Sequence, residues 1–333
     1  MTTAPSPAPT SPPTGADHNG WAIEVSGLTK RFGSLTAVDD LDFTVRPGRV
    51  TGFLGPNGAG KTTTLRMLLG LVRPTSGTAT IGGRRYDDLP HPLQTVGAAL
   101  ESTNFHPGRT GRDHLRVLAS AGGIPLARAD ELLEQVGIPA AARKRAGGYS
   151  MGMRQRLGLA AALLGDPGVL LLDEPANGLD PEGIRWLRGF LRHLADQGKT
   201  ILVSSHLLAE MEQTVDDIII IANGVRVAQG PITELRGEPT ALVRSSDPDG
   251  LRSALLVGGL TAETRPDGAL TVRTDDLARV GQLALQGHVP LSELRHLTSD
   301  LEALFFKLTE SPEHRNRNLG DRAQSSEQTG QQA

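Results

Sequence analysis

One short stretch constrains this chain more than any other. It consists of Gly55, Pro56, Asn57, Gly58, Ala59, Gly60, Lys61, Thr62 and Thr63, and it fits the pattern G-x-x-x-x-G-K-[ST]. Glycines let a backbone curl closely around an oxyanion, and a helix that comes next adds the positive end of its dipole. A lysine can place its charge on the β- and γ-phosphates, and a threonine hydroxyl suits the Mg²⁺ that arrives with a nucleotide. The stretch predicts a phosphate-binding loop (P-loop).

The residues on both sides of this loop support that interpretation. Residues 49–54 are mostly apolar and predict a short buried strand. Residues 63–69 predict a helix, with Leu65, Leu68 and Leu69 on one face. A glycine-rich turn that matched the motif by chance would not need a strand before it and a helix after it.

Composition limits the classes of protein. The chain has 333 residues, which suggests one large domain or two. Its net charge of -3 argues against a surface that binds nucleic acid strongly, and we expect no nucleic-acid partner. It contains no cysteine, so disulfides and thiolate catalysis are excluded. No apolar run approaches the roughly 20 residues that cross a bilayer, so we expect any membrane role to come through a partner.

The pattern along the chain predicts four regions. Residues 1–20 are rich in Pro, Ser and Thr and predict a disordered leader, and the polar residues 311–333 predict a disordered tail. Residues 21–235 alternate strands and helices around the P-loop, with two strands before it that suggest an antiparallel sheet and a mainly helical segment at about 100–164. Residues 240–310 predict a small α+β domain. The expected fold class is α/β, with a β subdomain, a helical subdomain and this C-terminal domain.

Individual elements can also be predicted. We expect helices over residues 126–136, 150–164, 181–197 and 207–215, with Ser150 and Asp180 as N-caps of the second and third. Asn223 and Gly224 lie between two apolar runs and predict a hairpin. A last helix is expected over residues 299–308, where a capping box begins at Ser299.

A second motif, which contains two acidic residues, lies at the end of a predicted strand. Residues 169–172 are all apolar and lead to Asp173 and Glu174, which resemble a Walker B motif. The P-loop, this acidic pair and the three segments described next follow one another in the order that ABC transporters show. Residues 22–230 therefore resemble the nucleotide-binding subunit of ABC transporters. The resemblance implies that Asp173 holds Mg²⁺ and that Glu174 acts as general base on the attacking water. The alternative for this acidic pair is a solvated turn.

The segment at 150–153 resembles the ABC signature, commonly LSGGQ. Ser150 and Gly152 match it, whereas Met151 and Met153 replace a glycine and the glutamine. We call residues 150–153 the signature segment. In the family this segment contacts the γ-phosphate bound to the opposite subunit, which implies a head-to-tail dimer. An ordinary capped helix is the alternative interpretation.

Four other residues gain roles from the resemblance. Asp180, in the segment that we call the D-loop (176–180), is expected to help the two sites communicate, in addition to capping a helix. His206 comes after a predicted core strand and resembles the switch histidine that touches the γ-phosphate. Phe32 is expected to stack on adenine, with a core phenylalanine as the alternative. Glu101 stands where the family has the Q-loop glutamine, so we expect it to bind the metal.

The resemblance implies an ATPase that uses ATP and Mg²⁺, with Lys61, Glu174 and His206 as its catalytic residues. It implies a peripheral subunit at the cytoplasmic face of the membrane, paired with a second copy and with separately encoded permease subunits. The glutamate at 101 and the Ser-x-Gly-Met form resemble the drug- and bacteriocin-resistance branch, which implies export of a small amphiphile such as an antibiotic or a lipid.

Two other functions remain open from the sequence. An ATP-gated regulatory or binding subunit would retain the P-loop and turn over little, as the departures at 101, 151 and 153 allow. A soluble ABC ATPase of DNA repair or translation would have long coiled coils or two cassettes. This chain shows neither between residues 61 and 150, and it has a single P-loop.

Overall fold

The structure is a computed structural model that describes residues 21–100, 105–235 and 239–297. The predictions for the leader, for Glu101, for the helix over residues 299–308 and for the tail lie outside the described residues.

A six-stranded sheet forms the centre of the larger unit. Its strand order is β5-β6-β7-β3-β8-β9, and the first five strands run parallel. The last strand pairs antiparallel with its neighbour. The strands are β5 (Val96–Ala99), β6 (Val169–Asp173), β7 (Thr200–Ser205), β3 (Val50–Leu54), β8 (Asp217–Ala222) and β9 (Val225–Pro231).

Both faces of this sheet are buried. Along β6, Leu170 and Leu172 pack with the helices on one face, whereas Val169 and Leu171 pack with α1 (Lys61–Leu68) and a second sheet on the other. This is why the strands read as continuous apolar runs rather than alternating ones. The second sheet is antiparallel, in the order β2-β1-β4. It comprises β1 (Ile23–Phe32), β2 (Leu35–Val45) and β4 (Ser76–Ile81).

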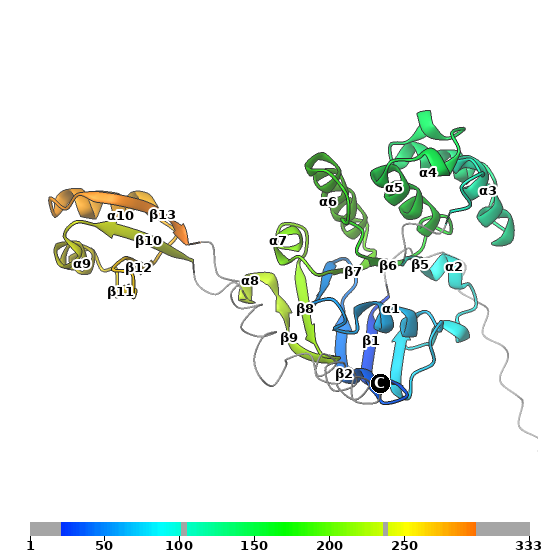
Figure 1. Cartoon of the computed structure of the whole chain (residues 1–333), viewed down its shortest axis with the longest axis horizontal. Helices are drawn as coiled ribbons and strands as arrows, with labels where there is room; N and C mark the ends of the chain where they lie inside the picture. Colours follow the sequence, from blue (N-terminus) through cyan, green and yellow to red (C-terminus); the bar gives the residue numbers. More distant parts are fainter. Residues whose placement is uncertain (1–20, 101–104, 236–238, 298–333) are drawn as a thin grey trace, which may run out of the picture.

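The helices on the first face form a separate cluster. Figure 1 shows α3, α4 and α5 gathered across the central sheet from β1 and β2. Their bounds are Gly111–Ala121, Arg128–Gln135 and Met151–Ala162. The predicted N-caps are confirmed, since Ser150 accepts from the Met153 N–H and Asp180 accepts from the Gly183 N–H at the start of α6 (Pro181–Asp196). The described part of the predicted helical subdomain is helical.

The remaining short elements connect these layers. They are a 3-10 turn (Tyr86–Asp88), α2 (Pro92–Thr95), two further 3-10 turns (Pro139–Ala141 and Ala146–Gly148), α7 (Leu208–Met211) and α8 (Ile232–Leu235). The helix predicted over 207–215 is wrong in length, because α7 spans only one turn. Arg192 binds both Thr214 O and the Asp216 carboxylate, and these contacts hold the chain in the turn that leads to β8. The predicted hairpin at Asn223 and Gly224 is confirmed, with φ of 50° and 82°.

The C-terminal unit has a sheet and a core of its own. Its strand order is β11-β12-β10-β13, and two helices pack on one face around buried residues such as Val243, Leu255 and Val280. This β-α-β-β-α-β arrangement is that of ferredoxin-like units. Its elements are β10 (Thr240–Ser245), α9 (Pro248–Val257), β11 (Ala262–Thr264), β12 (Leu270–Arg273), α10 (Leu277–Gln286) and β13 (Leu291–Leu297). The predicted fold class is confirmed.

Sequence reasoning missed β13. This strand lies at the sheet edge and none of its residues is fully buried, so it lacks the alternation that marks a half-buried strand.

Candidate functional site

The P-loop lies between β3 and α1 and is shaped by glycines that no larger residue could replace. A Cβ built on Gly55 would lie 2.5 Å from Ile221 O, and one on Gly60 would lie 2.6 Å from Ala37 O. Gly60 also has φ of 103° and precedes the first residue of α1. The loop therefore presents backbone N–H groups and a helix N-terminus at the carboxyl end of the central strand β3, as oxyanion binding requires.

Lys61 is buried at the start of α1, with 6% of its surface exposed. Its Nζ donates to Gly55 O at 2.7 Å and lies 3.4 Å from Glu174 Oε1. Burial lowers the pKa of the Lys61 ammonium, and the charge of Glu174 opposes this change. The ammonium thus lies inside the curl of the P-loop, beside the carboxylate at the end of β6.

Asp173 and Glu174 meet the P-loop at the same edge of the sheet. Thr62 Oγ1 donates to Asp173 Oδ2 at 2.7 Å, and the Ser204 hydroxyl donates to Asp173 Oδ1. Thr62 and Asp173 are far apart in sequence, and they meet because β3 and β6 lie parallel on either side of β7. A carboxylate beside a hydroxyl at a phosphate-binding loop is a donor set that suits Mg²⁺.

Glu174 is held in an uncommon backbone conformation. Its φ is 49°, in the left-handed region, and its N–H donates to Ser204 O at 3.2 Å and to Ser204 Oγ at 3.0 Å. Its Oε2 lies 2.9 Å from His206 Nδ1. The carboxylate is thereby placed between His206 and Lys61. Strain of this kind persists where the surrounding contacts over-determine the position, and it occurs most often at functional sites.

Ser204 contacts both acidic residues, although sequence reasoning assigned it no role. It is fully buried at the end of β7 and joins Asp173 to the backbone of Glu174. The only sequence signal for this role was its position, which is one residue before the end of the strand and two residues before His206. Its hydroxyl positions both acidic residues at once.

The signature segment forms the first turn of α5. Ser150 Oγ accepts from Met153 N, which leaves the N–H groups of Met151 and Gly152 at the helix start without intrahelical acceptors. Met151 is 44% exposed. This helix terminus can bind an anion.

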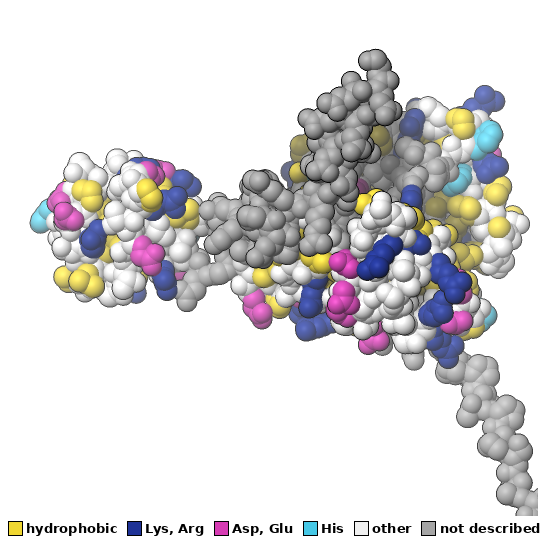
Figure 2. All heavy atoms as spheres, turned by 60° about the horizontal axis from the view of Figure 1, so that its bottom comes forward, with side chains coloured by type: hydrophobic (Ala, Val, Ile, Leu, Met, Phe, Trp, Pro, Cys, Tyr) yellow, Lys and Arg dark blue, Asp and Glu magenta, His cyan; other side chains and the backbone are white. Residues whose placement is uncertain are grey.

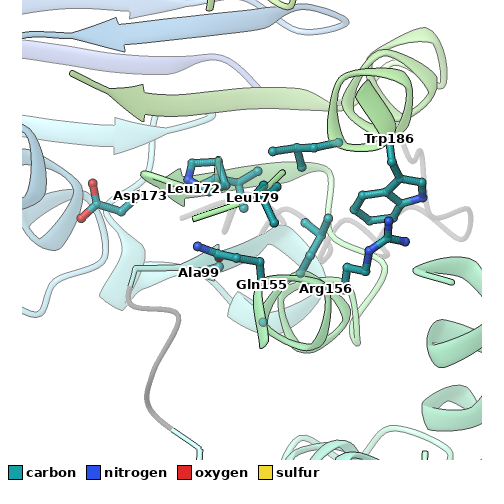
Figure 3. A pocket seen from close by; sticks show the side chains of 11 residues that line it. Ala99, Gln155, Arg156, Leu172, Asp173, Leu179 and Trp186 are labelled. Atoms are coloured by element: carbon teal, nitrogen blue, oxygen red, sulfur yellow. The ribbon is translucent and has the colours of Figure 1, made fainter. Parts of the chain in front are cut away.

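The D-loop lies against the same helix. Gln155 donates to Asn177 O at 3.2 Å, and the Arg156 guanidinium lies over the Trp186 ring at 3.7 Å. Figure 3 shows Gln155 and Arg156 on α5 facing Leu179 and Trp186, whereas the Asp173 carboxylate points away from them. The cavity that these residues line has a volume of about 20 Å³. Asp180 caps α6 and lies outside the group formed by Lys61, Asp173, Glu174 and His206.

Phe32 is not a core residue. It ends β1 with 49% of its surface exposed, and Lys30 Nζ lies 4.8 Å from its ring centroid. The alternative of a core phenylalanine is therefore wrong, because the side chain lies at the surface. Glu101 lies outside the described residues.

Two surface features bear on partners. Within the described ranges, no helix is long and apolar enough to cross a membrane. Figure 2 shows Lys and Arg side chains interspersed with Asp and Glu across the described part of the face that it presents. Such mixing gives no field of a single sign over that face.

Comparisons with known proteins agree with this geometry. The family model described as "ABC transporter" matches residues 38–177, and a model of a domain of unknown function matches residues 239–302. The bacitracin transport ATP-binding protein BcrA of Enterococcus faecalis is 37% identical over 298 residues, covering 86% of this chain and 96% of the relative. The Nod factor export ATP-binding protein I of Ralstonia nicotianae is 36% identical, covering 86% and 93%.

Solved structures show the same fold. A structure described as the ATP-binding subunit of an ABC transporter is 30% identical, with a TM-score of 0.58, over 64% of this chain and 91% of that one. A dimeric ATP-binding cassette bound to ADP and Pi is 22% identical, with a TM-score of 0.56, over 63% and 98%. The similarity to these cassettes thus covers about two thirds of the chain.

Proposed function

Because the chain belongs to the family of ATP-binding subunits of ABC transporters, whose members hydrolyse ATP to power transport, we propose specific roles for its residues in that reaction. The observation that carries the proposal is the Glu174 carboxylate, held between Lys61 and His206 at the mouth of the P-loop. The chain is an ATPase, and its P-loop, acidic pair and histidine each have a separate role in hydrolysis.

Residues 55–63 bind the phosphates of ATP through the N–H groups of the loop and the start of α1. Lys61 neutralises charge that develops on the γ-phosphate, and its present contacts with Gly55 O and Glu174 give way to the nucleotide. The exposed ring of Phe32 stacks on adenine.

Glu174 accepts a proton from the attacking water, and His206 orients both the water and the γ-phosphate. Their contact at 2.9 Å keeps the carboxylate directed into the site. Ser204 holds the backbone of Glu174, so the base does not rotate away when Lys61 turns to the nucleotide.

Thr62 and Asp173 fit a Mg²⁺ ion that arrives with ATP, and Glu101 is a further candidate ligand. Among the described residues, no group of three or more His, Cys, Asp or Glu side chains is placed to hold a metal ion. Mg²⁺ would supply neutralisation of the negative charge on the transferred phosphoryl group.

The working form is a head-to-tail homodimer, in which the signature segment of each chain completes the ATP site of the other. The N–H groups of Met151 and Gly152, which have no acceptor within α5, support this role, because they suit a γ-phosphate presented by a partner. Asp180 and the D-loop link the two sites. Membrane-spanning permease subunits are separate chains, and this subunit docks on them at the cytoplasmic face of the membrane.

The transported compound is a small amphiphile, exported from the cell. Relatives named for bacitracin transport and for Nod factor export support this class, and both align over nearly their whole length. We also propose the division of the chain into a cassette over 21–235 and a C-terminal domain over 240–310.

The test compares ATP hydrolysis by the full chain with that of Glu174→Gln, which keeps the shape of the side chain and removes its charge. We expect the variant to lose at least about 100-fold in kcat and to accumulate as an ATP-bound dimer in light scattering. Glu134→Gln, at an exposed position on α4, is the control and should behave as the native chain.

If the native chain hydrolyses no ATP even with its permease, the catalytic assignment is wrong and an ATP-gated binding subunit takes its place. If Glu174→Gln retains native turnover, another group is the general base.

A further inference from the structure

Met151 stands where the resemblance predicts glycine, and its side chain contacts the D-loop of its own chain. A Cβ built on Gly178 would lie 2.7 Å from Met151 Cγ, so the methionine occupies the space beside this glycine. Gly178 has φ of 75°, a conformation that residues with a Cβ rarely adopt. The contact therefore depends on the residue types at both positions.

Two neighbours of Met151 on α5 extend this contact. Gln155, one turn further along, donates to Asn177 O at 3.2 Å. A Cβ built on Gly152 would lie 3.4 Å from Leu179 Cδ2. Figure 3 shows Gln155 and Leu179 facing each other between α5 and the D-loop. One side of the first turns of α5 thus touches three consecutive residues, 177–179.

The D-loop is joined directly to the proposed general base. The Asn177 N–H donates to Glu174 O at 3.2 Å. The cavity between α5 and the D-loop is about 20 Å³, enough for about one water molecule. The contacts of Met151 with Gly178 and of Gln155 with Asn177 O join the start of α5 directly to the D-loop, so a displacement of this turn is transmitted to the D-loop.

We propose that Met151 is a positioning residue that couples the two ATP sites of the dimer. The inference rests on the proposed function, in which nucleotide bound to one chain contacts the signature segment of the other. That contact presses Met151 onto Gly178, and the D-loop passes the displacement to Glu174 of the same chain. Each site then hydrolyses fastest when nucleotide also occupies the other, which is positive cooperativity.

The experiment measures steady-state hydrolysis against ATP concentration for the full chain and its variants. Met151→Ala should lower kcat by about 10-fold to 100-fold, the cost of a misplaced catalytic group, and bring the Hill coefficient to 1. Its melting temperature, and its affinity for a fluorescent ATP analogue under conditions where the chain is monomeric, should match the native chain. Met151→Leu should restore both kinetic values, because it fills nearly the same volume.

A second pair of variants tests the contact itself. Gly178→Ala should reduce kcat, because its new Cβ meets Met151. In a Met151→Gly background, which already lacks the contact, Gly178→Ala should lower kcat by less than it does in the native chain, so that the two changes are not additive. Val117→Ala on α3 is the matched control, since Val117 is an apolar residue of similar exposure, 48% against 44%, with no contact to the D-loop among those described.

The inference is overturned if Met151→Ala keeps the native kcat and Hill coefficient, if Val117→Ala lowers them equally, or if the native Hill coefficient is already 1. It is also overturned if Met151→Leu fails as Met151→Ala does. Turnover by the native chain and the stalling of Glu174→Gln report on the proposed function separately. A native chain that hydrolyses ATP alongside an unaffected Met151→Ala would refute the coupling and leave the ATPase roles intact.

Discussion

Arg156 joins the helical cluster to the catalytic core, and its removal should destabilise the cassette measurably. Its Nη1 donates to Val136 O at 2.8 Å, at the end of α4, and its guanidinium lies 3.7 Å from the centroid of the Trp186 ring on α6. Burial lowers the pKa of Arg156, and Glu182 and Asp180 oppose this change. One side chain therefore bridges three helices.

These contacts give the expected loss of unfolding free energy on removal of the Arg156 side chain. A hydrogen bond from a charged group contributes about 1.5–3 kcal/mol, and a partly exposed cation–π contact contributes about 1 kcal/mol. Arg156→Ala should thus cost about 2–4 kcal/mol of the free energy of unfolding, allowing for partial solvent screening. A cassette of this size should then melt roughly 5–15 °C lower. Arg156→Lys keeps the charge and loses the planar stacking, so it should cost about half as much.

Urea unfolding followed by Trp186 fluorescence is the assay. The chain has two tryptophans, so Trp21→Phe leaves Trp186 as the sole indole reporter. Arg154→Ala is the control, because Arg154 lies two positions away on the same helix and its one side-chain hydrogen bond within the described residues is an exposed contact with Gly147 O at 3.4 Å. If Arg156→Ala costs no more than Arg154→Ala, the bridge contributes nothing to stability and the reasoning fails.

Three further changes, at His114, Ser204 and Leu255, have outcomes that the structure predicts. Burial and the charge of Arg109 hold the pKa of His114 below its usual value, so its protonation opposes folding and the free energy of unfolding falls as the pH drops below about 6.5. His114→Phe should flatten that fall between about pH 7.5 and pH 5 in urea titrations; an unchanged slope would exclude His114 as the cause. Ser204→Ala should lower kcat/KM for ATP by about tenfold, since Asp173 and Glu174 lose their shared partner; native kinetics would show that the backbone alone positions them. Leu255→Ala, at a fully buried position in the C-terminal core, should cost that unit about 2–5 kcal/mol. Hydrogen exchange should show the lost protection within residues 240–297, while ATP hydrolysis persists; lost protection throughout the cassette would contradict separate cores.

The P-loop and the strand before Asp173 could be predicted from sequence because their chemistry is local. Gly60 must precede the helix that begins at Lys61, and a continuous apolar run marks a strand covered on both faces. The caps at Ser150 and Asp180 are local for the same reason, since each side chain bonds an N–H three residues ahead.

Elements whose limits depend on distant contacts were harder to predict. The end of α7 depends on Arg192 and its bonds to Thr214 and Asp216. The edge strand β13 exists because β10 offers it hydrogen-bonding partners, and its own residues carry little periodicity. Exposure of Phe32 also results from its position at the end of β1 rather than from its residue type.

The α/β class, the P-loop, the acidic pair and the order of the motifs could all be predicted from residue patterns, because each depends on residues close together in the chain. Which of these residues meet depends on the packing of the strands and helices. The parallel pairing of β6, β7 and β3 brings Thr62, Ser204 and His206 to Asp173 and Glu174. The packing of α5 against the D-loop likewise places Met151 beside Gly178. Such contacts join residues far apart in sequence, and they form only when buried strands and helices close around a shared core.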